Sequence, residues 1–266
     1  MTNRVIAACC AGLATLTLAA CTSDDPSRDD AAVAMPTAVE APSEVQGPAA
    51  PGDTTPPTTS TTASHQAAPP QLVTPGKLGA LLVPIEELND LVGAKLGFEQ
   101  QFNRPAKPAG GLGEKSGCAV LFGSNSDSYA NEYTAFRRVS VRDGEDSSQH
   151  FVAQEVAAFA DPATATANFG KTFDKTALAG CNDAVVHRQG EDDRITWRFN
   201  VTAVNTDSAR WTLTQLSDGK PNDWTCAHEA RTKSNVESAV TVCQFGNGTP
   251  AATAIGDRIA KWIPQP

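Results

Sequence analysis

The chain has 266 residues and a formal net charge of −9, from 30 acidic residues against 21 lysines and arginines. Between residues 22 and 72, seven acidic residues against Arg28 contribute −6, and Arg4 contributes +1, so the rest of the chain carries −4. This balance provides no basic face, and we therefore expect no nucleic-acid partner and no binding to anionic lipid head groups through surface charge.

The first 20 residues are expected to be a lipoprotein signal peptide. Arg4 is followed by an apolar run that ends in Leu18-Ala19-Ala20-Cys21, and small residues before a cysteine are typical of a bacterial lipobox. The run of about 16 residues is shorter than the roughly 20 that span a bilayer, which disfavours a transmembrane anchor. A secretory signal without lipidation is the remaining alternative. We predict that Cys21 carries the lipid and tethers the chain to the extracytoplasmic face of the cell membrane.

Residues 21–72 are predicted to be the lipidated cysteine and a disordered linker. The stretch is rich in Pro, Thr, Ser, Ala and Asp and nearly lacks large apolar residues, as in the run at 51–62. Such a composition buries too little apolar surface to offset the entropy of ordering. A coil of about 50 residues spans roughly 40 Å, which would hold a domain away from the membrane. The remaining segment, 73–266, has the size of one domain.

The first half of that domain is predicted to contain two helices and two strands. Apolar residues between Leu81 and Val92 recur at helical spacing, with Gly93 at the end. Residues 103–116 form a Pro- and Gly-rich loop, and strands are expected at 133–142 and 151–159. A helix follows from the Asp161-Pro162 cap to Gly180. Its expected core-facing stripe consists of Ala165, Phe169, Phe173 and Ala177.

The second half reads as strands followed by one helix. Strands are expected at 184–187, 194–201, 209–213, 224–231 and 236–244, with Trp197 and Trp211 on inward-facing positions. The chain then closes with a helix at 250–263, in which Ile255, Ile259, Trp262 and Ile263 share one side. Apolar and polar residues alternate along these strands, and the connections between the strands are short. This pattern predicts an antiparallel sheet that has one solvated face and helices on the other. The predicted fold class is therefore α+β.

Four cysteines remain in the domain, and an even number in an exported chain predicts two disulfides. Cys226 and Cys243 are symmetric about the turn between the last two strands, so an antiparallel hairpin would place them opposite each other. Cys118 and Cys181 then pair by elimination. A metal site is the alternative, but no C-x-x-C pair is present, and we expect no metal.

Motifs that carry catalysis or cofactor binding are missing from the sequence. We find no G-x-S-x-G, H-E-x-x-H, phosphate-binding or dinucleotide-binding pattern. The domain histidines, His150, His187 and His228, have no ligand-like spacing. A triad assembled in space stays open, but the sequence favours a chain that is not an enzyme and needs no cofactor.

Four residues are candidates for ligand binding. Trp197 and Trp211 are either core residues or an aromatic platform on the sheet, and Arg137 or Arg198 would supply a positive charge nearby. Together they would line a pocket for an amphipathic or acidic small molecule. The acidic run Glu191-Asp192-Asp193 is interpreted as a solvated hairpin tip rather than a paired-carboxylate site.

The order of elements resembles the PknH-like extracellular domain, which occurs as the sensor region of a mycobacterial receptor kinase and alone in mycobacterial lipoproteins. The resemblance covers most of residues 76–264. It depends on Leu82-Val83-Pro84-Ile85-Glu86-Glu87-Leu88-Asn89, Val156-Ala157-Ala158-Phe159, Val204-Asn205-Thr206-Asp207, Trp224-Thr225-Cys226, Asn235-Val236 and the four cysteines. It implies a strongly bent antiparallel sheet packed against helices, the same two disulfides, and a large cleft proposed to bind a ligand. Unlike the receptor form, this chain has no kinase domain and no membrane-spanning helix.

These observations predict a lipid-anchored, non-enzymatic, sensor-like binding module of the mycobacterial cell envelope. Its partners would be the membrane, through the lipid, and an unknown small molecule or envelope component. An interaction module that binds an envelope protein without a small ligand is the alternative. An envelope hydrolase is the third hypothesis.

Overall fold

The computed structural model describes residues 71–145 and 148–265. The signal peptide predicted at 1–20, the lipidation site Cys21 and all but the end of the predicted linker at 21–72 lie outside the described residues. The described residues thus belong almost entirely to the predicted domain, 73–266.

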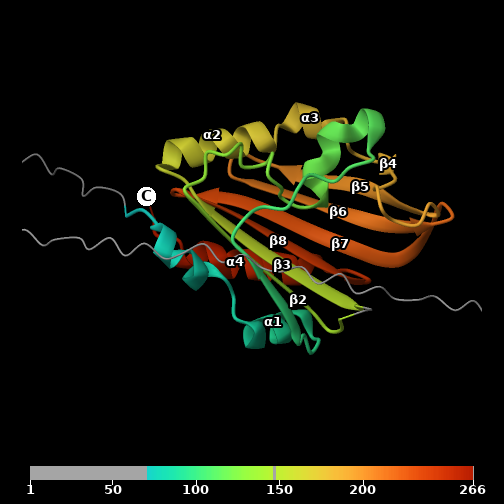
Figure 1. Cartoon of the computed structure of the whole chain (residues 1–266), viewed down its shortest axis with the longest axis horizontal. Coiled ribbons are helices and arrows are strands. Elements are labelled where there is room, and N and C mark those ends of the chain that lie inside the picture. Colours follow the sequence, from blue (N-terminus) through green and yellow to red (C-terminus); the bar gives the residue numbers. More distant parts are fainter. Residues whose placement is uncertain (1–70, 146–147, 266) are drawn as a thin grey trace, which may run out of the picture. The chain divides into compact units, whose positions relative to one another are not determined.

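Eight antiparallel strands form a single bent sheet in the order β1-β2-β3-β8-β7-β6-β5-β4 (Figure 1). The strands are β1 Phe98–Phe102, β2 Ala135–Arg142, β3 His150–Ala158, β4 Val185–Val186, β5 Ile195–Val204, β6 Ser208–Ser217, β7 Lys220–Lys233 and β8 Val236–Phe245. The predicted strands are thus confirmed. Only β1 was not predicted, because it is an edge strand whose exposed residues do not alternate.

In the described part of the chain, four α-helices and two 3₁₀-helices accompany the sheet. They are η1 Pro75–Leu81, α1 Ile85–Val92, η2 Gly113–Phe122, α2 Pro162–Thr172, α3 Lys175–Ala179 and α4 Thr249–Trp262. The helix expected from Asp161 to Gly180 is in fact two helices. Asp174 caps the second by accepting from the Ala177 backbone N–H at 2.8 Å, and this break leaves Ala177 exposed rather than in the core.

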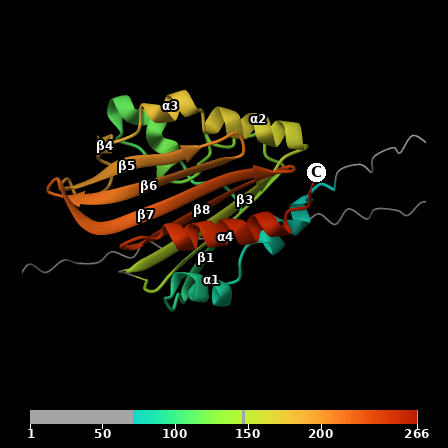
Figure 2. The same ribbon diagram turned by 180° about the vertical axis from the view of Figure 1, so that it is seen from behind.

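Helices cover both faces of the central strands, so the expected solvated face is wrong. Alternate residues of β8 point in opposite directions: Val240 packs into a core with η1, α1 and α4, whereas Ala239 packs into a second core with η2, α2 and α3. Figure 1 and Figure 2 show α2 and α3 along one face and α4 along the other. Ile255 and Ile259 of α4 and Ile263, which caps its end, are buried as predicted, but Trp262 is 39% exposed.

Both predicted disulfides are present. Cys118 of η2 bonds to Cys181, which follows α3. Cys226 and Cys243 are paired residues of β7 and β8, with Cα atoms 3.9 Å apart. All four sulfurs are therefore in cystines, and none is a thiolate that could bind a metal.

No helix within 71–145 and 148–265 has the length and apolar character needed to cross a membrane.

Candidate functional site

An open groove of about 1180 Å³ lies between the first helices and the edge of the sheet. One wall comes from η1, α1 and their connection, and the other comes from β1, β2 and the segment after β1. Its lining residues are Gly79, Leu82, Val83, Pro84, Ile85, Leu88, Glu99, Gln101, Phe102, Asn103, Arg104, Pro105, Ala106, Arg137, Arg138 and Val139. The wall contributed by η1 and α1 is almost entirely apolar.

A buried amide holds this apolar wall against the sheet. Gln154 of β3 accepts from the Val83 backbone N–H at 2.8 Å and donates to the Val83 carbonyl at 2.6 Å. Gln154 is 1% exposed, so both bonds are shielded from water. The amide of Asn235 in the β7–β8 turn fastens Val73 in the same way. The groove therefore has a fixed wall, although the chain there is a short helix and a connection.

The charges that line the groove are mostly positive. Arg104 and Arg137 are exposed and form no ion pair with any described residue. Arg138 is bound to Glu155 at 3.2 Å and lies over the Phe102 ring, 5.6 Å from its centroid. Glu99 is the one acidic residue among the lining residues. The groove thus combines an apolar wall with two guanidinium groups that have no carboxylate partner among the described residues, although Arg137 also donates to the Phe136 carbonyl at 2.8 Å.

The structure does not bring the four predicted ligand-binding residues together. Arg137 lines the groove. Trp197 is 6% exposed and donates its Nε1–H to Glu191 at 2.7 Å, and Trp211 is 2% exposed and donates to the Leu121 carbonyl at 2.7 Å. Arg198 lies on the opposite face of β5 from Trp197 and is exposed.

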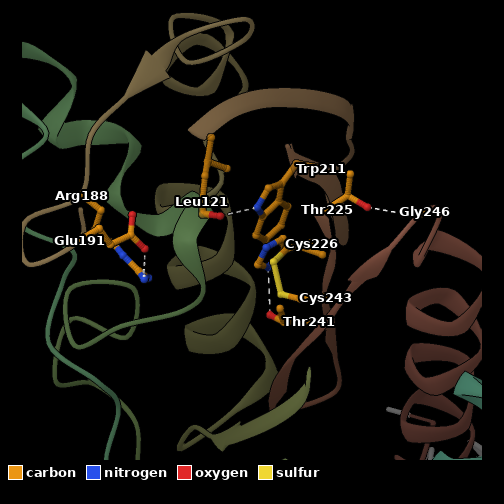
Figure 3. Close-up of a disulfide and its surroundings, with 10 residues drawn as sticks. Leu121, Arg188, Glu191, Trp211, Thr225, Cys226, Thr241, Cys243 and Gly246 are labelled. Carbon is orange, nitrogen blue, oxygen red and sulfur yellow. Dashed lines mark hydrogen bonds and ion pairs between the residues drawn. A yellow bond between two sulfur atoms is a disulfide. The ribbon is translucent and has the colours of Figure 1, made fainter. Parts of the chain in front are cut away.

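Both tryptophans are core residues, which was one of the two interpretations of the sequence. Figure 3 shows Trp211 bonded to Leu121 and close to the Cys226–Cys243 cystine. Its ring also stacks on His228, with centroids 5.0 Å apart. The two indoles are therefore shielded from solvent, and Arg137 is the residue of the four that lines the groove. That Arg137 contacts a ligand stays a prediction.

A second, smaller hollow of about 230 Å³ lies on the α2 side of the sheet. Arg138 and Ala106 line it as well as the groove. The other lining residues are Lys107, Ala109, Ala119, Phe122, Gly123, Ser124, Asn125, Phe151, Glu155, Arg188 and Thr241. Arg188 is bound to Glu191 (Figure 3). Its guanidinium also lies over the Phe122 ring.

Buried ionisable groups accumulate on this face of the sheet. Burial raises the pKa of Glu155 to about 7, against the opposing effect of the Arg138 charge. Burial also raises the pKa of Glu237 to about 8, although Asn168 donates to its carboxyl at 2.8 Å. Burial lowers the pKa of His228 to about 3, so its ring is neutral at pH 7.

These carboxyls predict that stability falls as the pH rises. Between pH 4.5 and about 8 the folded chain keeps a proton on Glu237 that the unfolded chain releases, so the free energy of unfolding decreases through that window. Glu237→Gln keeps an acceptor for Asn168 and removes the charge. We expect this variant to be more stable than the parent by a few kcal/mol at pH 8 and similar to it at pH 4.5. Urea unfolding at both pH values measures this difference, and a variant no more stable than the parent at pH 8 would contradict it.

Three residues that line or support these two hollows were not among the sequence-based candidates. Arg104 lies in a segment interpreted only as a loop, and nothing local marks it. Gln154 and Glu155 are adjacent polar residues inside the otherwise apolar strand β3, and such an interruption is a signal of a buried polar role. Asp192 lies where the sequence predicted, at an exposed tip, and pairs with Arg194 at 3.0 Å.

Comparisons with known proteins agree with this architecture. The family described as "PknH-like extracellular domain" matches residues 73–261. The crystal structure of the extracellular domain of PknH from Mycobacterium tuberculosis superimposes with a TM-score of 0.61 and 23% identity, covering 72% of this chain and 96% of that chain. At this identity the likeness concerns the fold alone. No curated protein matches the chain.

Proposed function

The chain belongs to the family of PknH-like extracellular domains, and from this premise we propose that it is a lipid-anchored, extracytoplasmic ligand-binding module of the cell envelope. Its ligand is an amphipathic anion held in the groove. The module acts as a sensor or carrier, and that it is not an enzyme stays a prediction. Binding of an envelope protein is the alternative function.

The disulfides and the lipobox support the extracytoplasmic placement. Structural disulfides persist in oxidising compartments and are rare in the cytosol. Leu18-Ala19-Ala20-Cys21 supplies an attachment point, and one diacylated cysteine places more than one acyl chain in the bilayer, as stable anchoring requires.

Lipidation has a direct test in the mass of the N-terminal peptide. The protein is purified from cell membranes, digested and analysed by mass spectrometry. We expect a peptide that begins at Cys21 and carries acyl groups, and a Cys21→Ser variant that leaves the membrane fraction. An N-terminal peptide that retains Met1 to Ala20, or one that begins at an unmodified Cys21, would contradict the proposed anchor.

The observation that carries the ligand proposal is the pairing of two unmatched arginines with an apolar wall. Arg104 and Arg137 have no carboxylate partner among the described residues, while Leu82 and Ile85 present partly exposed apolar side chains to the same groove. Guanidinium groups bind phosphate and carboxylate through charge-assisted hydrogen bonds, and the apolar wall favours a hydrocarbon tail. An amphipathic anion meets both requirements.

A head-group series tests this proposal. The oxidised protein is titrated with dodecyl phosphate, with dodecyl maltoside or with inorganic phosphate, and calorimetry measures the binding. Each dodecyl compound is kept below the concentration at which it forms micelles. We expect dodecyl phosphate to bind at least about tenfold more tightly than either of the others, since it alone has both parts. Equal affinity for the phosphate and maltoside compounds would contradict a role for the arginines.

A further inference from the structure

The small hollow on the α2 side of the sheet contains an acidic and a basic group side by side in its wall. Glu155 is 4% exposed, and its Oε1 lies 3.2 Å from the Arg138 guanidinium. Its Oε2 accepts from the Tyr129 hydroxyl at 3.4 Å. The hollow holds about 230 Å³, enough for a molecule of a few heavy atoms and too small for a lipid tail of ordinary length. It therefore differs in kind from the groove.

One donor of this pair has no acceptor. The Nε of Arg138 is buried and forms no hydrogen bond with any described residue. A buried donor without a partner is costly, and a bound acceptor would remove that cost. Ser124 and Thr241 also line the hollow, and the Thr241 hydroxyl bonds to the His228 ring at 2.9 Å. The wall thus offers positive, negative and neutral polar groups within one small space.

We propose that the small hollow binds a small zwitterion, namely an α-amino acid whose ammonium and carboxylate are both free. The ammonium pairs with the Glu155 carboxylate, and the carboxylate accepts from Arg138. In an α-amino acid the ammonium nitrogen lies about 2.5 Å from the carboxyl carbon, so the two charges match the adjacent opposite charges of the Glu155–Arg138 pair. A simple anion would instead face the charge of Glu155.

The remaining walls limit the size and nature of the side chain. Ala106, Ala109 and Ala119 are small, and Phe122 and Phe151 are apolar, so a short apolar side chain fits best. Arg188 also lines the hollow and adds a second guanidinium, which is already bound to Glu191. This inference is independent of the groove and does not require its ligand.

The proposed ammonium contact predicts the direction of a pH effect on affinity. The charged groups around Glu155 are Arg138, Arg188 and Lys107. The neutral Tyr129 hydroxyl donates to Glu155, neutral His228 lies beside Thr241, and Glu237 lies near Tyr129. A ligand ammonium requires the ionised form of Glu155, whose pKa is about 7 in the free protein. Affinity for an α-amino acid therefore rises with pH through that range.

The test uses L-alanine and its two halves, acetate and ethylamine, with the oxidised full chain. Backbone amide shifts of residues at the hollow, such as Ala119, Gly123 and Thr241, are followed by NMR at pH 6 and pH 8. We expect L-alanine to saturate these shifts below about 10 mM at pH 8, to bind about tenfold more weakly at pH 6, and to bind more tightly than either half.

Two variants separate charge recognition from a structural effect. Glu155→Gln removes the charge and is expected to weaken L-alanine binding at least about tenfold. Glu237→Gln is the matched control, because Glu237 is also buried on this face but does not line the hollow, and it is expected to bind as the parent does. Tighter binding of acetate than of L-alanine, unchanged affinity in Glu155→Gln, or no shift at the hollow up to about 20 mM would overturn the proposal.

Discussion

Replacing Cys118 and Cys181 together with serine is expected to lower the free energy of unfolding by about 4 kcal/mol. The two cysteines are 63 residues apart in sequence, so their bond removes the larger share of chain entropy from the unfolded state. The bond also ties η2 to the end of α3, and η2 carries the backbone carbonyl that accepts from Trp211. Urea unfolding, with the midpoint and the slope both fitted, measures the loss.

The hairpin disulfide supplies the matched comparison. Cys226 and Cys243 are 17 residues apart, and the same entropy argument gives about 3 kcal/mol for their replacement by serine. The β7–β8 pairing holds the two strands together without the bond. A smaller loss for the Cys118–Cys181 replacement than for the hairpin replacement would show that loop length does not govern the stability of this domain.

Removing the two unmatched guanidinium groups is expected to weaken the binding of dodecyl phosphate about 100-fold. Arg104→Gln and Arg137→Gln each remove a charge-assisted hydrogen bond, and about tenfold, or about 1.4 kcal/mol, is expected from each. Both side chains are exposed, so little change in the free energy of unfolding is expected. Calorimetric titration of the single and double variants measures the affinities, with dodecyl maltoside as the uncharged reference ligand.

Arg198→Gln is the control for general charge effects. Arg198 is exposed like Arg137 but lies on β5, far along the sheet order from the groove. It should bind dodecyl phosphate as the parent does. A loss in the control equal to that in the groove variants would mean that net charge, and not the groove, determines the affinity.

Much of the fold could be predicted from local patterns in the sequence. Ile195, Trp197 and Phe199 alternate with polar residues, and they form an inward-facing row on β5. The pairing of Cys226 with Cys243 could be predicted because the two cysteines are symmetric about the turn of the hairpin. The N-cap Asp161 begins α2 as its sequence predicts, with its side chain accepting from Thr164 N–H at 2.8 Å. Each of these features depends on neighbours that are close in the chain.

Elements without such patterns were missed or misplaced. The strand β1 has exposed residues and is defined by its pairing with β2, from Phe98 with Arg142 to Phe102 with Arg138. The expectation of one solvated face was wrong because β3 and β8 are buried on both sides, and the direction of each helix relative to the sheet is set by distant contacts. The pattern of polar and apolar residues along one strand cannot reveal a second layer of helices when both faces of the sheet are buried.

The candidate site was the least predictable part of the molecule. Arg137 was a candidate because of its strand position, but the wall opposite it comes from residues far away in sequence. The contact that fixes this wall joins Val83 to Gln154, which are 71 residues apart. From the sequence, Trp197 and Trp211 could be either core residues or an aromatic platform. The structure buries both, and their N–H groups bond to Glu191 and to the Leu121 carbonyl. Pocket geometry of this kind is a property of tertiary packing.

The proposed ligand of the groove is tested most directly by an experimental structure of the oxidised protein with dodecyl phosphate bound. We expect the phosphate within hydrogen-bonding distance of Arg104 and Arg137, with the hydrocarbon chain along Leu82 and Ile85. A phosphate bound elsewhere on the protein, or a groove left empty at saturating ligand, would contradict it.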